Sequence, residues 1–221
     1  MSLLGLAIVA AAGIKTIVFF IYFFLYLHYR ERFLGYWTLA WGLIFIKSVL
    51  DPFILSIMQT IPLFIIFQTN IILSVFFFAW GAWNFVGKKL SIQWVYFAII
   101  ATLIAIGGML LDLPTYISII PVIIMFGLIH IHTGIILLHH LDMPGLGKKL
   151  TAYAFIINGL HQFDFPLFRP SEMAPWGYLL DAFLRLVIGV GFLLAYFEKT
   201  RADLARQEAR FRLLAENARD I

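Results

Sequence analysis

Cysteine is absent from the sequence, and charged side chains are scarce. Without cysteine the chain has neither a disulfide framework nor a thiolate metal site, so nothing in it reports the redox compartment. Asp, Glu, Lys and Arg make up 13% of the residues and hydrophobic residues 62%, whereas soluble domains are only about 45–50% apolar. The composition therefore excludes an ordinary soluble domain and predicts an integral membrane protein. The net charge is +4, but the basic residues form short scattered clusters, so we expect no nucleic-acid partner.

Seven apolar segments are long enough to cross a bilayer, which takes about 20 residues of helix. The first lacks a preceding basic region and exceeds the core of a signal peptide, so we expect it to remain in the mature protein. Turn signals such as Pro62, Pro114 and the MPGLG stretch at 143–147 fall between the segments. The expected spans are 5–28, 36–57, 62–86, 92–110, 115–138, 150–168 and 176–197.

The basic residues of the loops predict the orientation, because short loops rich in Lys and Arg stay in the cytoplasm. The even-numbered loops show no excess of them. The N-terminus is therefore expected outside and the C-terminus inside, in a multi-pass protein of the inner (plasma) membrane. The basic pairs of the odd-numbered loops and the tail are Arg30 and Arg32, Lys88 and Lys89, Lys148 and Lys149, and Lys199 and Arg201.

Polar side chains within the predicted spans gather at one depth. A charge at membrane depth costs roughly 2.5–3.5 kcal/mol on insertion scales, so each needs a partner or a purpose. Counting about 1.5 Å of rise per residue places eight such side chains in the outer half of the bundle. They are Lys15, Lys47, Asp51, Asn70, His161, Asp164, Asp181 and Arg185.

Two interpretations of this polar layer stay open. Three pairs have the spacing of one helix face and would form structural ion pairs between or within helices. Taken together below an outer opening, the eight residues favour a polar pocket for a small ligand. The pairs are Lys47 with Asp51, Asp181 with Arg185, and His161 with Asp164.

A second polar group, in the fifth span, offers an alternative. Histidine in a membrane bundle can ligate haem or another metal, and His130 and His132 lie there, with His28 as a candidate partner at the end of the first span. His130 and His132 are two residues apart, so on a helix they point about 200° from each other. A haem- or metal-binding redox or gas sensor is thus the alternative function, and the cofactor is otherwise unknown.

Other classes of membrane protein fit less well. A retinal protein needs a buried lysine in its last helix, where this chain has Arg185 and no lysine. A channel or pump would place polar residues at several depths, and the inner half has almost no acids. A small transporter is a further alternative, although no internal repeat supports it.

The tail differs from the rest of the chain, because residues 198–221 hold 11 of the 28 formal charges. Strong helix formers continue from the seventh span, and Phe197, Leu204, Phe211 and Leu214 recur at about every seventh residue. The pattern predicts one helix that leaves the membrane and pairs with a second copy, since a single helix of this length is marginal alone.

The final residues, FRLLAENARDI at 211–221, resemble the opening of a PAS domain in bacterial signalling proteins. There such a start follows the last membrane helix and leads to a histidine kinase or diguanylate cyclase module. The stretch 158–178 is similar to the turn between helices six and seven of the input regions of such sensors, which implies ligand contacts or a gating turn at His161, Asp164, Arg169 and Trp176.

The expected architecture is an all-α bundle of seven transmembrane helices over 1–197 and a cytoplasmic linker helix over 198–221 that leads into a PAS domain. The expected function is a sensory receptor that binds a small molecule in its outer half and works as a homodimer. No kinase or cyclase motif is present, so we expect no enzymatic activity in this fragment.

Overall fold

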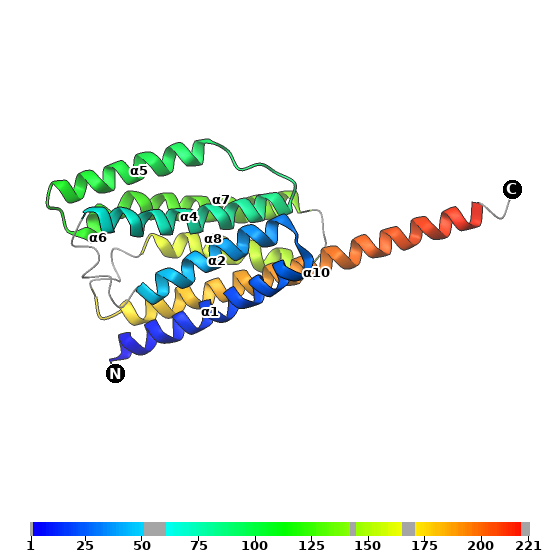
Figure 1. Cartoon of the computed structure of the whole chain (residues 1–221), viewed down its shortest axis with the longest axis horizontal. Helices are drawn as coiled ribbons and strands as arrows, with labels where there is room; N and C mark the ends of the chain where they lie inside the picture. The colour runs from blue at the N-terminus through cyan, green and yellow to red at the C-terminus, as the bar shows by residue number, and fades with distance from the viewer. Residues whose placement is uncertain (1, 51–60, 142–144, 165–170, 218–221) are drawn as a thin grey trace.

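The computed structural model describes residues 2–50, 61–141, 145–164 and 171–217, and all regular structure in these ranges is helical. The helices are α1 (Leu3–Tyr29), α2 (Arg32–Leu50), α4 (Ile61–Phe85), α5 (Gln93–Leu110), α6 (Thr115–Ser118), α7 (Ile120–His140), α8 (Leu146–Gln162) and α10 (Ala174–Asn217). They lie roughly parallel in an elongated bundle, from which the end of α10 protrudes as a long rod (Figure 1).

Six of the described helices, α1, α2, α4, α5, α7 and α10, are long and apolar enough to cross a bilayer. Large apolar side chains such as Val9, Ile17 and Leu103 are exposed on the outside of the bundle, where lipid tails replace water. The chain is therefore a multi-pass membrane protein with an all-helical fold. α8 is shorter, at 17 residues, so the seventh crossing stays a prediction.

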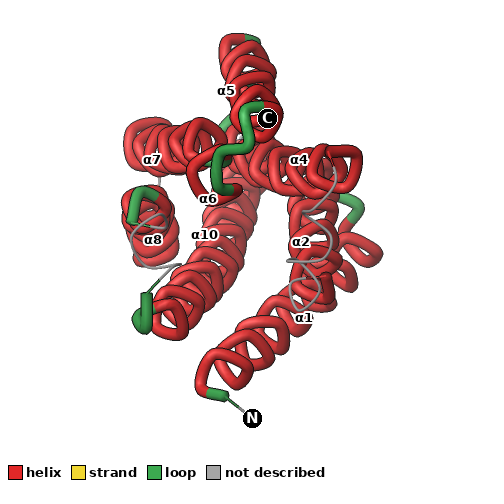
Figure 2. Tube along the Cα trace, turned by 90° about the vertical axis from the view of Figure 1, so that its left-hand side faces the viewer, coloured by secondary structure: helices red, strands yellow, loops and turns green. Residues whose placement is uncertain are grey.

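The helices form a ring. Successive neighbours around it are α1, α2, α4, α7, α8 and α10, and α10 closes the ring against α1. α5 lies outside the ring against α7 and α4, as the view along the bundle shows (Figure 2). The arrangement brings the first and last helices side by side although they are far apart in the sequence.

Two of the helix boundaries that differ from the predicted spans have an identifiable cause. The fifth span, predicted over 115–138, is divided into α6 and α7 at Ile119, because Pro121 in the first turn of α7 cannot donate a backbone hydrogen bond. The sixth, predicted over 150–168, begins at Leu146, where Glu198 accepts the backbone N–H groups of Leu146 and Gly147. Beyond Asp164 the predicted end of that span lies outside the described residues.

Aromatic packing fills the ring in the half from which the rod emerges. The ring of Trp37 stacks on that of Phe192 with centroids 3.9 Å apart, and Tyr22 donates a hydrogen bond to the Gly189 carbonyl at 2.7 Å. The Tyr22 bond ties α1 to α10, and Gly81 of α4 lies so close to Trp37 that a side chain there would collide with the indole. This half is mainly an aromatic core, whereas the ionisable side chains of the bundle interior lie in the opposite half.

Candidate functional site

A cavity of about 150 Å³ lies inside the ring, between α1, α2, α4, α7, α8 and α10. This is the volume of an apolar cavity that holds a benzene molecule. Apolar side chains such as Ile44, Phe67 and Ile71 form part of the wall. The ionisable and polar side chains that line it are Lys15, Lys47, Gln68, Ser74, His161, Gln162, Asp164, Tyr178, Asp181 and Arg185.

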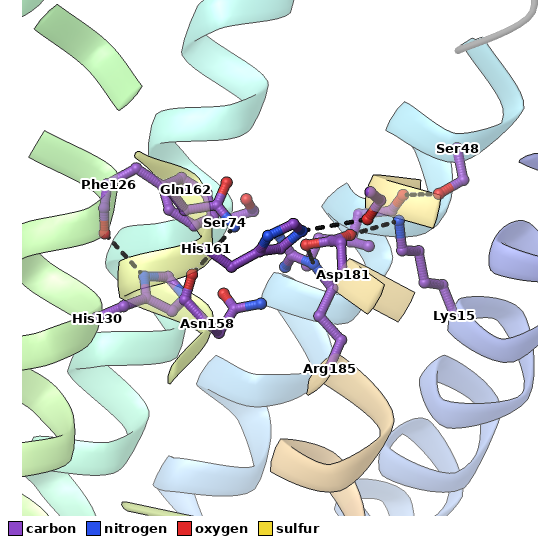
Figure 3. Close-up of polar contacts among 12 residues, drawn as sticks. Lys15, Ser48, Ser74, Phe126, His130, Asn158, His161, Gln162, Asp181 and Arg185 are labelled. Carbon is purple, nitrogen blue, oxygen red and sulfur yellow. Dashed lines mark hydrogen bonds and ion pairs between the residues drawn. The ribbon is translucent and has the colours of Figure 1, made fainter. Parts of the chain in front are cut away.

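Asp181 connects two buried cations across the cavity wall (Figure 3). Its Oδ2 lies 3.1 Å from Lys15 Nζ on α1, and its Oδ1 accepts a hydrogen bond of 2.8 Å from Arg185 Nε, one turn further along α10. The side chains of Lys15 and Arg185 are only 5% and 10% exposed. The Arg185 guanidinium also lies over the ring of Phe126, 5.5 Å from its centroid. One carboxylate thus serves two buried cations on two helices.

His161 joins α8 to α10 on the other side of the cavity. Its Nδ1 lies 2.7 Å from Asp164 Oδ2 and its Nε2 lies 3.2 Å from the Gly177 carbonyl oxygen. A carbonyl oxygen only accepts hydrogen bonds, so Nε2 carries a proton. The imidazole is therefore held in one orientation by its two partners.

Gln68 is a cavity residue that sequence reasoning missed. It is 1% exposed, and its Nε2 donates to no described residue although it is enclosed by protein. Phe67, Gln68, Ile71 and Ser74 line the cavity at spacings of one, three and four residues, which is one face of α4. That periodicity is the signal that identifies Gln68.

Asn70, predicted for the site, does not line the cavity. Two residues beyond Gln68, it points about 200° away on the helix. Its side chain is half-buried, and its Oδ1 has no partner among the described residues. The polar residue that α4 contributes to the cavity is therefore Gln68, which lies on a different face of the helix from the predicted Asn70.

The other predicted site residues fall in three places. Lys47 lines the cavity, and its Nζ lies 5.7 Å from the Phe67 ring centroid. Asp51 and Arg169 lie outside the described residues. Trp176 is exposed at the start of α10 and does not line the cavity.

The histidines of the metal alternative have separate surroundings. The buried ring of His130 stacks on Phe126, with centroids 4.4 Å apart, and its Nδ1 lies 3.1 Å from the Phe126 carbonyl oxygen. His132 packs against Trp83 and Trp94, while His28 is exposed at the end of α1. Within the described ranges, no three His, Cys, Asp or Glu side chains are grouped to hold a metal ion.

A second set of polar contacts lies where α10 leaves the bundle. Glu198 accepts hydrogen bonds of 3.1 and 3.3 Å from the backbone N–H groups of Leu146 and Gly147, at the start of α8. Lys199 donates one of 3.2 Å to the carbonyl of Phe85, the last residue of α4. Glu198 thus lies at the positive end of the α8 dipole, and Lys199 lies at the negative end of the α4 dipole. We call these two residues the exit clasp.

No protein-family model, curated protein or solved structure matches the chain. Function is therefore inferred from the cavity, from α10 and from the exit clasp.

Proposed function

We propose that the chain is a membrane sensory input domain that binds a small molecule in the cavity and signals through α10 to a cytoplasmic effector. The observation that carries the proposal is the continuity of α10 over Ala174–Asn217. Its first part supplies Asp181 and Arg185 to the cavity. Its last part is the exposed rod (Figure 1). A displacement of α10 at the cavity would therefore be transmitted along the rod to the segment that follows it.

The distribution of basic residues supports a cytoplasmic rod. The exit clasp shows that the end of α4, the start of α8 and the start of the rod share one end of the bundle. The basic pairs of the odd-numbered loops lie at these helix ends, and such loops stay in the cytoplasm. The cavity then faces the outer half of an inner (plasma) membrane, with the N-terminus outside. α8 completes a seven-helix topology in this proposal, because it packs along both α7 and α10.

Ligand binding would act by favouring one of two positions of α10. Asp181 and Arg185 contact Lys15 of α1 and Phe126 of α7, so a ligand that changes these contacts changes how α10 sits between its neighbours. The exit clasp holds α10 to α4 and α8 at the point where it leaves the bundle. We propose that the clasp defines one signalling state.

The rod supports a dimeric arrangement with an effector beyond it. Phe197, Leu204, Phe211 and Leu214 are exposed on the rod. Phe197, Leu204 and Phe211 repeat at the heptad step, and Leu214 takes the next seam position after Phe211, which is the pattern of one seam of a two-stranded coiled coil. We propose a homodimer joined along this seam. The PAS-like ending is the basis for proposing a kinase or cyclase module after it, and the fragment itself is proposed to have no enzymatic activity.

The absence of cysteine allows a direct test. Spin labels on a Lys88→Cys/Arg206→Cys variant in nanodiscs would report the distance between the exposed loop after α4 and the rod. Adding Asp181→Asn, which removes the carboxylate between the two cations, is expected to shift or broaden the distance distribution. Asp112→Asn makes the same chemical change in an exposed turn and is expected to leave it unchanged. Identical distributions for all three proteins would contradict coupling between the cavity and the rod.

A further inference from the structure

The charges around the cavity do not cancel. Lys15, Asp181 and Arg185 together carry one positive charge, and both oxygens of Asp181 are already engaged by the two cations. Lys47 adds another cation. Asp51, four residues further along the sequence, is the acid available to offset Lys47. Counting Asp51 in full therefore still leaves one positive charge.

His161 and Asp164 do not remove this charge. Because Nε2 donates to the Gly177 carbonyl, the 2.7 Å contact between Nδ1 and Asp164 Oδ2 needs a second proton between them. Two bare acceptors at that distance would repel each other. An imidazole and a carboxylate that share this proton are neutral as a pair, whichever atom holds it. The cavity as a whole therefore has a surplus of one positive charge.

The hydrogen-bonding groups show the same surplus of donors. Arg185 uses Nε for Asp181, and its two terminal amino groups donate to no described residue. Gln68 lines the same cavity, and its amide nitrogen is enclosed without a partner in the described chain. A buried donor without an acceptor is costly. What is missing on the described wall is an anion with acceptor oxygens.

The size and the remaining lining restrict what that anion is. A cavity of about 150 Å³ is comparable to one that holds benzene. Ile44, Phe67, Ile71 and Phe126 present apolar surface to it, which an inorganic ion would leave uncovered. An organic acid with one carboxylate and a short apolar body meets all of these conditions.

We propose that the cavity binds a small monocarboxylate, with its carboxylate oxygens at the terminal amino groups of Arg185 and the amide nitrogen of Gln68, and its apolar part between α2, α4 and α7. Arginine suits this role because its planar fork matches a carboxylate. The inference rests on the proposed function, in which this cavity is the receptor site, and it adds the chemical class of the ligand.

The test is a calorimetric titration of the purified protein in nanodiscs with three probes of similar size: benzoate, benzamide and benzylamine. Benzoate is expected to bind about tenfold or more tightly than benzamide, since a hydrogen-bonded charge is lost in the amide. Benzylamine is expected not to bind. Equal or tighter binding of benzamide or benzylamine would overturn the carboxylate assignment, as would no binding by any of the three.

Gln68→Glu makes the test specific to the cavity. The substitution keeps the shape of the side chain but replaces the donating amino group with an oxygen, so benzoate affinity is expected to fall about tenfold or more while that for benzamide stays. Gln93→Glu adds the same charge at an exposed site and is expected to change neither. If Gln68→Glu does not fold, Gln68→Met removes the donors without adding charge and is expected to weaken benzoate alone. Unchanged benzoate binding in whichever variant folds would overturn the proposal.

The spin-label distances separate the two proposals. If Asp181→Asn moves the rod but benzoate does not bind, the ligand class is wrong and the receptor function stands. If benzoate binds but Asp181→Asn leaves the rod unmoved, the carboxylate site stands and the signalling function fails.

Discussion

Replacing Asp181 with Asn tests whether the ion cluster is buried and how much it contributes to stability. In the wild-type protein this carboxylate lies 3.1 Å from Lys15 Nζ and 2.8 Å from Arg185 Nε, and the two cations are at least nine-tenths buried. Asn keeps the shape but raises the charge of the three residues from one to two. Breaking a buried ion pair by removing one partner costs roughly 3–5 kcal/mol. We expect a loss of this size in the free energy of unfolding.

The loss can be measured by reversible unfolding in SDS, followed through tryptophan fluorescence. Asp112→Asn, in an exposed turn, is expected to change the free energy of unfolding by less than about 0.5 kcal/mol. Adding Lys15→Met to Asp181→Asn returns the cluster to one positive charge, and it is expected to restore at least half of the loss. If Asp181→Asn is as stable as Asp112→Asn, the cluster is solvated and the reasoning from burial is refuted.

Three further outcomes are expected. Glu198→Gln weakens the cap on the first turn of α8 by about 1 kcal/mol, and amide hydrogen exchange should speed up there while α5 is unaffected. Gly159→Leu destabilises the protein by more than about 3 kcal/mol, because α7 backbone lies within van der Waals contact of Gly159, and thermal unfolding followed by fluorescence measures this. Leu204→Cys, on the exposed apolar seam of the rod, is expected to form a disulfide between two copies in nanodiscs. Arg206→Cys is expected to form several-fold less of it, because this residue lies outside the seam. Equal cross-linking of the two variants would contradict the proposed dimer.

The sequence predicts interactions within one helix better than those between helices. Asp181 with Arg185 follows from a spacing of four residues within α10, because helix geometry alone brings such side chains together, and this contact is present. The contact between His161 and Asp164 is present too, although Asp164 lies in the turn that follows α8. The contact between Lys15 and Asp181 depends on α1 lying beside α10, which is set by the packing of the whole ring. Residue spacing alone therefore does not predict that Lys15 pairs with Asp181.

The other differences between the predicted and the observed structure concern where helices begin and end and which helix face a residue occupies. The continuation of the last span into a rod was predicted from helix-forming residues, and α10 confirms a single helix to Asn217. Depth in the membrane predicts Asn70 as part of the polar layer, but the face of α4 decides that Gln68 lines the cavity and Asn70 does not. The early start of α8 depends on Glu198, 51 residues away from Gly147, and no local signal carries that information.

The cavity can be compared with what a purely structural ion cluster requires. Burial of charge is tolerated when each charge is paired and each donor has an acceptor. Asp181 meets that condition, since both of its oxygens are engaged. Gln68 does not, because its amide nitrogen is enclosed without an acceptor in the described chain, and the terminal amino groups of Arg185 have no described acceptor either. Because a buried donor without an acceptor costs stability, an apolar residue at position 68 should make the folded protein more stable. Gln68→Leu should therefore raise the free energy of unfolding and abolish benzoate binding, and a loss of stability with binding intact would show that Gln68 is structural.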